Sequence, residues 1–539
     1  MKPYLNNVSG KSTSDVTMFS GGLNTCYDRA FIRDEQMPFM WNVGLYEAPT
    51  LATRSNRLSL GWALKDTTNY ATGKVLAMLP LTNKRLYIIE EREDADNHVY
   101  RYEVVNGMLQ KNYVGSVVNS NKYSMCECRD SDNIYIVIAT DNKRYILTDA
   151  TETAIKASED EYTGIVACHK NRLWVANGTS LKFSKLREYD DFDASDGSAG
   201  EINVTNAHGD ITAIIPYDSK LIIFCEYSWH VLYGSSPNAE VDQFSLIDMD
   251  DGIGCVSDKA VTICNRRLYF MDSDSSIYQY NGSSLIKISE PYGSDNYASY
   301  GGIKGVNINP FRLEQICMSS FDSYLYISFT RGIEADALND TLAVYDTNNR
   351  LWWLEDGDFE QLTKWETSAF SGRTDHLLGA KYNGDILILN RLQKTNTDTV
   401  FNTETRHFDE IEIQYAFETK TWLLGTIKHK KTLTNVWLQA NAEGKIGVCD
   451  CWTTHDVDSW YNTLDRGYIV LGDIKKAKNH NITNPSINYH EGGERKRFIV
   501  PRMYMQKVNS FAFRVEGKGY GAFYLLEKEW RIRWGYMGI

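Results

Sequence analysis

A short strand pattern recurs at long, nearly regular intervals through the middle of this chain of 539 residues. Each copy has a polar or charged residue, then Leu or Ile, then aromatic or aliphatic residues in alternation, and ends in a turn cluster. The Leu or Ile positions are 48, 39, 48, 47, 57 and 61 residues apart. They are Leu86, Ile134, Leu173, Leu221, Leu268, Leu325 and Ile386. A period of roughly 40 to 50 residues is typical of folds that repeat one small sheet around a ring.

Most of these runs are followed by a second strand across a polar turn. Phe270 and Ile277–Tyr280, for example, are separated by Asp272–Ser275, which has the composition of a hairpin turn. Two sandwich domains would give turn signals about every 8 to 12 residues, without the longer repeat. The spacing therefore predicts an all-β fold containing a β-propeller of about six or seven blades over residues 73–395.

The two ends of the chain lack this repeat. In residues 396–539, alternation places Ile411, Ile413, Tyr415 and Phe417 on one face of a strand, and Trp530, Ile532 and Trp534 alternate near the end. This pattern predicts a separate antiparallel sheet or sandwich. Residues 1–72 are expected to form an arm and a few strands of the same platform domain. The two ends should meet, which makes the propeller an insertion or an attached domain.

Composition supports sheet over helix and argues against broad binding to nucleic acid. Aromatic residues make up 12% of the chain and Pro only 10 residues, and aromatic side chains favour a pleated, half-buried surface. The net charge is −13, which opposes affinity based on phosphate neutralisation. Residues 471–539 carry 13 Lys and Arg against 6 Asp and Glu, so the first 470 residues have a net charge of −20. A basic end on an acidic body suggests that copies, or acidic neighbours, dock end to body; the alternative is a solvated sheet face.

Nothing in the sequence predicts export or a membrane span. The first residues have no apolar run behind Lys2, and no stretch approaches the roughly 20 apolar residues that cross a bilayer. The chain is therefore expected to be made and kept in the cytosol until lysis. Its ten cysteines include two close pairs, Cys126/Cys128 and Cys449/Cys451. Because no matching pair lies at finger spacing, no zinc site is predicted.

Four short stretches resemble sites of chemistry. Gly10–Ser12 lacks the earlier glycine and strand of a phosphate-binding loop, and His490–Glu494 lacks the second histidine of a metalloprotease helix. Asp190–Gly197 could chelate calcium but departs from the EF-hand order, so a loop between blades is the preferred interpretation. The same holds for Asp248, Asp250 and Asp251.

No catalytic residue, cofactor site or metal ligand is predicted, and the chain is expected not to be an enzyme. A Ser-His-Asp site would lack the Gly-x-Ser-x-Gly turn that exposes the serine in hydrolases. Facing carboxylates of a glycosidase are not excluded by sequence, but the repeated Ser-x-Asp-x-Gly-x-x-Trp turn of sialidases is missing.

Four segments near the N-terminus carry a resemblance to a known family. They are Met18–Thr25, Asp34–Pro38, Trp41–Val43 and Leu51–Arg54. Together they resemble the opening of the tail hub and nozzle proteins of short-tailed bacteriophages, of the packaged-DNA-stabilisation type. Later stretches with a similar order are Phe183–Lys185, Asp190–Asp193, Ile211–Pro216, Trp229–Gly234, Lys430–Lys431, Arg495–Arg497 and Trp530. The asparagine-rich residues 470–494 depart from the family pattern, which leaves the limits of the closing sheet open.

The resemblance implies a structural protein of the virion tail, assembled in the cytoplasm of a bacterial host. It implies a homohexameric ring below the portal and adaptor proteins, with tail fibre or spike proteins attached. Genomic DNA would pass through the channel without sequence recognition, and an acidic wall would let the duplex slide. The ring would retain the genome and then release it.

Two other functions remain open at this stage. The first is a propeller that binds surface glycans, with Trp352 and Trp353 as an exposed platform; the alternative for that pair is packing within a blade. The second is a propeller hydrolase acting on polysaccharide.

Overall fold

The computed structural model describes the chain in thirteen segments. These are residues 13–92, 96–150, 155–158, 162–238, 241–290, 301–370, 373–390, 395–423, 430–450, 469–474, 494–499, 506–508 and 510–533. Within them the protein is all-β, made of many small antiparallel sheets. The described helices are short 3-10 turns, η1 (Leu60–Ala63), η2 (Asp258–Ala260) and η3 (Leu313–Gln315). No helix in the described segments is long and apolar enough to span a bilayer.

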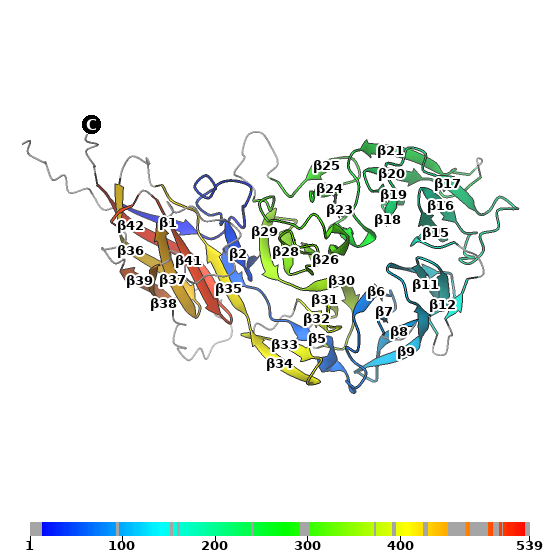
Figure 1. Ribbon diagram of the computed structural model, residues 1–539, viewed down its shortest axis with the longest axis horizontal. Helices are drawn as coiled ribbons and strands as arrows, with labels where there is room; N and C mark the ends of the chain where they lie inside the picture. The colour runs from blue at the N-terminus through cyan, green and yellow to red at the C-terminus, as the bar shows by residue number, and fades with distance from the viewer. Residues whose placement is uncertain are drawn as a thin grey trace, which may run out of the picture.

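Seven sheets follow one another along the chain, and we call them together the seven-sheet part (Figure 1). The first three are β6 (Val75–Pro80), β7 (Leu86–Glu90), β8 (Asp96–Val105) and β9 (Met108–Val118); β10 (Tyr123–Arg129), β11 (Ile134–Thr140), β12 (Arg144–Thr148) and β13 (Lys156–Ala157); and β14 (Ile165–His169), β15 (Arg172–Asn177), β16 (Ser180–Phe183) and β17 (Gly200–Asn203).

The next three sheets also have four strands each. They are β18 (Ile211–Tyr217), β19 (Lys220–Cys225), β20 (Ser228–Tyr233) and β21 (Ser245–Asp251); β22 (Val261–Cys264), β23 (Arg267–Met271), β24 (Ile277–Tyr280) and β25 (Leu285–Lys287); and β26 (Cys317–Phe321), β27 (Tyr324–Phe329), β28 (Thr341–Asp346) and β29 (Leu351–Asp356). The seventh sheet has six strands, in the order β30 (Phe359–Glu366), β31 (Asp375–Lys381), β32 (Ile386–Ile388), β5 (Leu58–Ser59), β33 (Thr397–Asn402) and β34 (His407–Glu412).

Each recurrent Leu or Ile of the sequence pattern falls in a different one of these sheets. Six of them lie in the second strand of their sheet, and Ile386 lies in β32, the third strand of the seventh sheet. Second strands are apolar on both faces because neighbouring sheets cover both. Phe224 on β19, for example, is fully buried and packs on Phe270 of β23, with ring centroids 4.6 Å apart.

Contacts between first strands run around the seven-sheet part and return to their start. Strand β6 contacts β10, β10 contacts β14, and β14 contacts β18. The short helix η2 contacts both β18 and β26, and β26 also contacts β22. β26 contacts β30, and β30 contacts β6. Figure 1 shows the seven sheets succeeding one another around this group of first strands.

The seventh sheet combines distant segments. Strand β5, from the N-terminal region, lies between β32 and β33. Strands β33 and β34 therefore belong to this sheet, although the sequence interpretation grouped residues from 396 onward with the C-terminal sheet. The predicted common face is wrong at one position: Ile411 on β34 is 53% exposed, whereas Ile413, Tyr415 and Phe417 are buried. The chain leaves one sheet and enters another between β34 and β35 (Gln414–Glu418).

A buried carboxylate holds β5 in the seventh sheet. Asp385 accepts hydrogen bonds from the hydroxyls of Ser59 (2.6 Å) and Tyr70 (2.7 Å) and from the backbone N–H of Phe401 (2.8 Å). Its side chain has no exposed surface. Burial raises the pKa of Asp385 to about 6, although these hydrogen bonds oppose the rise.

We expect Asp385 to make stability fall with rising pH. The folded state holds the proton more tightly than the unfolded chain, where the pKa of Asp is about 3.9. The associated stability is complete below about pH 4 and is lost as the pH rises through about 6, a difference of roughly 3 kcal/mol. In urea unfolding from pH 4 to pH 7, Asp385→Asn should lose this part of the slope, while Asp409→Asn on the exposed strand β34 should keep it. Equal slopes in wild type and Asp385→Asn would contradict the assignment.

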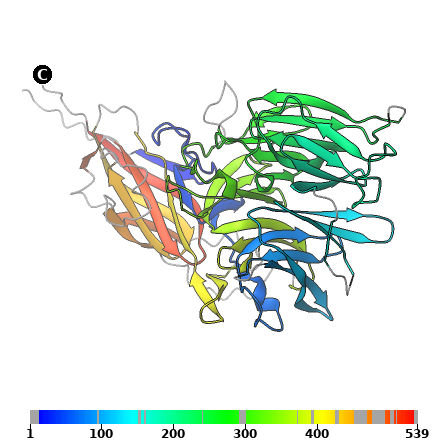
Figure 2. The same ribbon diagram turned by 45° about the vertical axis from the view of Figure 1, so that its right-hand side comes forward.

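Two larger sheets combine the two ends of the chain, and we call them the two-sheet part (Figure 2). One sheet has the order β3–β4–β42–β36–β39, with β1 paired to β42 and β40 paired to β36; the second has the order β2–β35–β41–β37–β38. The strands are β1 (Thr13–Met18), β2 (Phe39–Trp41), β3 (Val43–Glu47), β4 (Thr50–Thr53), β35, β36 (Lys430–Asn441), β37 (Gly444–Asp450), β38 (Ile469–Ile474), β39 (Glu494–Ile499), β40 (Gln506–Val508), β41 (Phe511–Lys518) and β42 (Ala522–Arg533).

Aromatic side chains join the two sheets face to face. Phe417 of β35 packs on Phe523 of β42, with ring centroids 4.9 Å apart, and Phe19 packs on Phe417 at 5.2 Å. Trp530 is buried in this core. Ile532 lies on β42, while Trp534 lies outside the described residues.

Candidate functional site

The most elaborate polar site lies where the two-sheet part meets the seven-sheet part. Strand β29 of the sixth sheet contacts β2 and β3. Backbone hydrogen bonds cross from one part to the other: the N–H of Leu23 donates to the carbonyl of Trp352 (2.7 Å), and that of Asn42 donates to Leu354 (2.9 Å). In return, the N–H of Asp356 donates to Asn42 Oδ1 (2.9 Å). We call this region the joint.

Five charged side chains form a cluster in the joint. They are Arg54, Arg57, Glu355, Asp356 and Asp398. Arg54 bridges two carboxylates: its Nε is 2.9 Å from Asp356 and its Nη2 is 2.6 Å from Asp398. Arg57 lies 2.9 Å from Asp356 and 3.1 Å from Glu355. The planar guanidinium groups thus act as forks that bind several carboxylates at once.

Three of the five charged side chains are almost fully shielded from water. The Arg54 side chain is 2% exposed, and those of Arg57 and Glu355 are each 5% exposed. Burial alone would lower the pKa of Arg54, but Asp356 and Asp398 raise it above its ordinary value. Burial raises the pKa of Asp356, but Arg54 and Arg57 outweigh that effect and hold it well below the usual range. Arg54 and Asp356 therefore hold each other in the charged form.

The N-terminal segments that carry the family resemblance build this joint. Gly22 has φ +66°, and a Cβ there would lie 3.1 Å from the carbonyl oxygen of Trp352. Asn24 donates to Gln36 (2.9 Å), and Asn42 accepts from Arg54 Nε (3.0 Å). The sequence pointed to the segment of Arg54 but missed Asp356 and Asp398, its partners. Two acidic residues directly after the apolar Leu351–Leu354 were the available signal.

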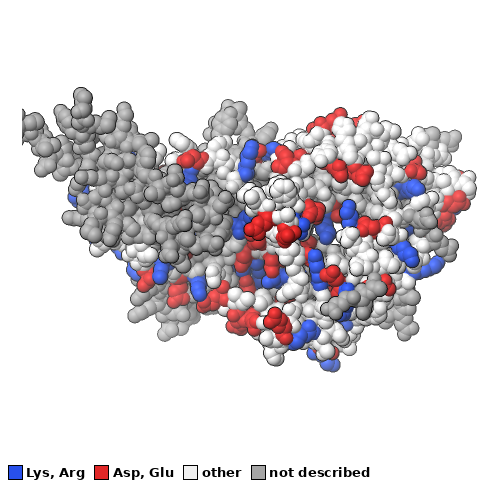
Figure 3. Space-filling model, viewed as in Figure 1, with Lys and Arg blue, Asp and Glu red and all other residues white. Residues whose placement is uncertain are grey.

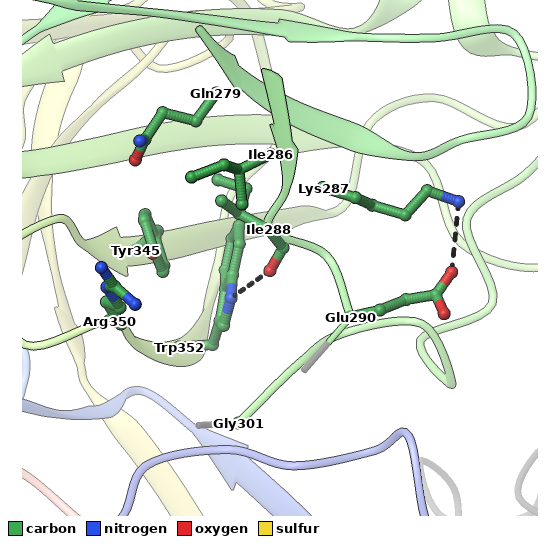
Figure 4. A pocket seen from close by; sticks show the side chains of 9 residues that line it. All are labelled: Gln279, Ile286, Lys287, Ile288, Glu290, Gly301, Tyr345, Arg350 and Trp352. Atoms are coloured by element: carbon green, nitrogen blue, oxygen red, sulfur yellow. Dashed lines mark hydrogen bonds and ion pairs between the residues drawn. The ribbon is translucent and has the colours of Figure 1, made fainter. Parts of the chain in front are cut away.

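The structure excludes Trp352 and Trp353 as an exposed platform for sugars. Both side chains have no exposed surface. Trp352 Nε1 donates to the carbonyl of Ile288 (3.2 Å), and Trp353 packs against Tyr46, with ring centroids 4.8 Å apart. Figure 4 shows the space beside Trp352, a cavity of about 30 Å³. That volume is one water molecule's share of the liquid, so this pair packs the core as the alternative interpretation required.

Ser228, His230 and Asp248 form a hydrogen-bonded row that the sequence did not reveal. His230 Nε2 is 3.2 Å from Ser228 Oγ, and His230 Nδ1 is 2.8 Å from Asp248. Hydrogen bonds from Asn206 and His230 lower the pKa of Asp248. The arrangement has the residue types of a hydrolase triad, and its signal was a Ser-x-His strand followed by an Asp on the next strand.

Burial gives this row a structural role. Ser228 and His230 have no exposed surface, and Ser228 Oγ already accepts a hydrogen bond from the backbone N–H of His208 (3.0 Å). A nucleophilic serine must be reached by the acyl carbon that it attacks. In this conformation Ser228 instead ties β20 to the preceding loop, and His230 ties it to β21.

The acidic loop that was considered as a calcium site already surrounds the ammonium group of Lys185. Lys185 Nζ lies 3.0 Å from Asp191, 3.9 Å from Asp193 and 3.4 Å from Asp196. The ammonium group stands among the carboxylates that would have to bind a metal. Of the second group, Asp250 and Asp251 are exposed on β21, and Asp248 binds His230. Within the described segments, no cluster of His, Cys, Asp and Glu is arranged to hold a metal ion.

The remaining sequence candidates do not form a site in the described residues. Cys126 and Cys128 lie on β10 beside Cys168 of β14, and hydrogen bonding to both neighbouring thiols raises the pKa of Cys128. Cys449 lies on β37, while Cys451 lies outside the described residues. Gly10 to Ser12 and the residues from His490 to Gly493 also lie outside them, and Glu494 begins β39.

The described surface includes an open groove and carries mixed charge. A groove of about 530 Å³ runs between the second and third sheets, within the usual size range of ligand sites. Its lining includes Tyr135, Lys156, Arg187, Tyr189 and Asp190. Acidic and basic side chains are interspersed over the face of the seven-sheet part in Figure 3.

Comparison with known proteins does not assign the chain to a family. No protein-family model matches the chain, and the curated proteins contain no match to it. The function must therefore be argued from the joint, the sheets and the charges themselves.

Proposed function

We propose that the seven sheets are the blades of a seven-bladed β-propeller inserted in a two-sheet platform. The circuit of first-strand contacts from β6 to β30 and back to β6 supports this fold. Strand β5, contributed from before the first blade, completes the last blade. In such a ring a strand from the opposite end of the chain closes the circle noncovalently, because each blade buries its faces only against its neighbours.

On this fold we propose a non-enzymatic structural role: a hub or nozzle subunit of a short-tailed phage tail. The subunit would assemble as a ring at the DNA exit, contact portal and adaptor proteins, anchor fibres or spikes, and retain and release the genome. The joint is the observation that carries the proposal. The segments resembling this family supply Arg54 and Asn42 to an ion cluster that joins the proposed propeller to the platform. The net charge of −13 suits a wall along which DNA slides.

Assembly tests this function directly. We expect the purified protein, alone or with a portal and adaptor complex, to form a ring of six subunits in negative-stain images. Native mass spectrometry should then give a mass of about 370 kDa, six times the 61.6 kDa chain. A protein that stays monomeric at high concentration and does not associate with virions would refute the proposal.

The open groove supports a second candidate function, glycan binding by the propeller. The partly exposed Tyr135 supplies an aromatic face there, and Lys156, Arg187 and Asp190 supply polar groups. Binding of a monomer to a glycan array, lost in Tyr135→Ala but retained in Trp62→Ala, whose indole is 59% exposed elsewhere, would favour this function over the first.

A further inference from the structure

The seven-stranded sheet of the platform has an edge strand on each side. Strand β1 pairs with β42 along its whole length, from Thr13 opposite Trp530 to Met18 opposite Leu525. Strand β39 pairs with β36 from Asn435 opposite Ile499 to Ala440 opposite Glu494. Among the described residues, neither β1 nor β39 pairs with a second strand. Each edge thus presents a row of backbone groups able to pair with another strand.

Exposed apolar side chains mark both edges. Val16 and Met18 on β1 are 53% and 58% exposed, and Ile499 on β39 is 71% exposed. Asp15, the only carboxylate of β1, forms an ion pair with Lys528 of the neighbouring strand β42. Natural edge strands usually carry charges that prevent pairing. Strand β1 has no charged residue beside Val16 and Met18 other than Asp15, whereas β39 carries Lys496 and Arg497 close to Ile499.

Two edge strands of the propeller show the protected arrangement for comparison. On β34, the exposed Ile411 is flanked by Glu410 and Glu412. On β21, Ile247 and Met249 alternate with aspartates. The contrast within one molecule indicates that β1 is built to be covered, while β39 presents a basic edge.

A buried lysine fixes which side of β1 faces outward. Lys528 has no exposed surface; its ammonium lies 3.0 Å from Asp15, donates to Thr17 Oγ1 (2.8 Å) and stands 4.1 Å from the centre of the Trp422 ring. Asp15 and Thr17 therefore lie on the Lys528 side of the sheet. Alternation along the strand then turns Val16 and Met18 to the opposite side, so their exposure follows from the contacts of Asp15 and Thr17 with the buried Lys528.

We propose that β1 of one copy of this chain pairs with β39 of the next copy, so that the platform sheet continues from subunit to subunit. Both strands are six residues long and lie on opposite edges of one sheet. A contact between two different surfaces of the same protein repeats head to tail and forms a ring where the rotation between copies closes. Strand β39 carries Lys496 and Arg497 and lies in residues 471–539, which have a net charge of +7 against −20 for the rest of the chain, so β39 offers a basic edge to an acidic neighbour.

This inference rests on the ring proposed above and specifies its interface. It uses the mode of recognition in which backbone hydrogen bonds supply affinity and alternate side chains supply register. The exposed Val16 and Met18 of one copy would lie beside Ile499 of its neighbour, which would cover the apolar residues of both edges.

A pair of double variants tests the interface. We expect Val16→Lys/Met18→Lys to abolish the ring and leave monomers, with at least a tenfold loss of association and an unchanged circular-dichroism spectrum. The matched control is Ile247→Lys/Met249→Lys on the edge strand β21, which should assemble like wild type. A β1 variant that still forms the wild-type ring would overturn the proposal.

Mixed cross-linking tests the same contact without relying on a disruptive variant. We expect a disulfide-linked dimer when Met18→Cys protein is mixed with Ile499→Cys protein under mild oxidation, but not when either variant is oxidised alone. Absence of this dimer from rings that assemble normally would overturn the β1–β39 contact and leave the ring standing. A wild-type protein that is monomeric under all conditions would overturn both the ring and this interface.

Discussion

Replacement of Arg54 by Met is expected to lower the free energy of unfolding by about 3 to 5 kcal/mol. The substitution keeps most of the apolar stem but leaves Asp398, whose side chain is 11% exposed, without its guanidinium partner. A buried charge that loses its partner keeps the desolvation cost without the compensating attraction. Because Arg54 also reaches Asp356 of the seven-sheet part, we expect the two-sheet part and the seven-sheet part to melt in two separate transitions in place of one.

Calorimetry and urea unfolding measure this effect, and Arg33 supplies the control. The Arg33 side chain is 39% exposed and lies 3.7 Å from Glu35, so Arg33→Met should cost about 1 kcal/mol or less. Arg54→Lys should fall between wild type and Arg54→Met, since an ammonium group cannot bind two carboxylates as a fork. If Arg54→Met and Arg33→Met lose the same small amount, the joint does not depend on the ion cluster.

Replacement of Trp352 by Ala is the second change with a large expected effect. Removal of a fully buried indole costs about 3 to 5 kcal/mol through lost burial and the cavity left behind. Trp352 packs on Tyr345, with ring centroids 4.5 Å apart, and its backbone carbonyl accepts from Leu23 across the joint. The cavity of about 30 Å³ already beside it would enlarge into the core.

Urea unfolding of Trp352→Ala should be read against Trp62→Ala. The indole of Trp62 is 59% exposed and packs edge-on against Phe408 at 5.1 Å; we expect a loss of about 1 kcal/mol or less there, because much of its surface stays in water. Trp352→Ala with wild-type stability and impaired glycan binding would contradict the packing role and restore the platform hypothesis for this pair.

The joint and the proposed ring interface use different strands of the two-sheet part. Strands β2 and β3 contact β29 of the seven-sheet part beside the ion cluster, while β1 and β39 are the edges used by the proposed interface. A rigid joint would let the two-sheet part of one subunit set the orientation of its seven-sheet part. Substitution of Arg54 should therefore make the proposed propellers less sharply placed in averaged images of the ring, while the ring formed by the platforms stays intact.

Periodic features were predicted well because they depend on neighbours along the chain. The runs at Leu86 and Leu325 each became the second strand of a sheet, where the apolar pattern is decided by local alternation and turns. The exposed Ile411 escaped prediction because alternation does not show where a strand ends and the chain passes to a different sheet.

An all-β chain with a long central repeat and ends of different character could be read from the residues alone, since strand period, turn composition and charge are local properties. The site could be found only once the chain was folded. Arg54 and Asp398 are 344 positions apart, and Lys528 and Thr17 are 511 apart. Such pairs leave no periodic signal in the sequence, because they form where different sheets pack against each other. A charged side chain that this packing buries then needs a partner, whatever its distance along the chain.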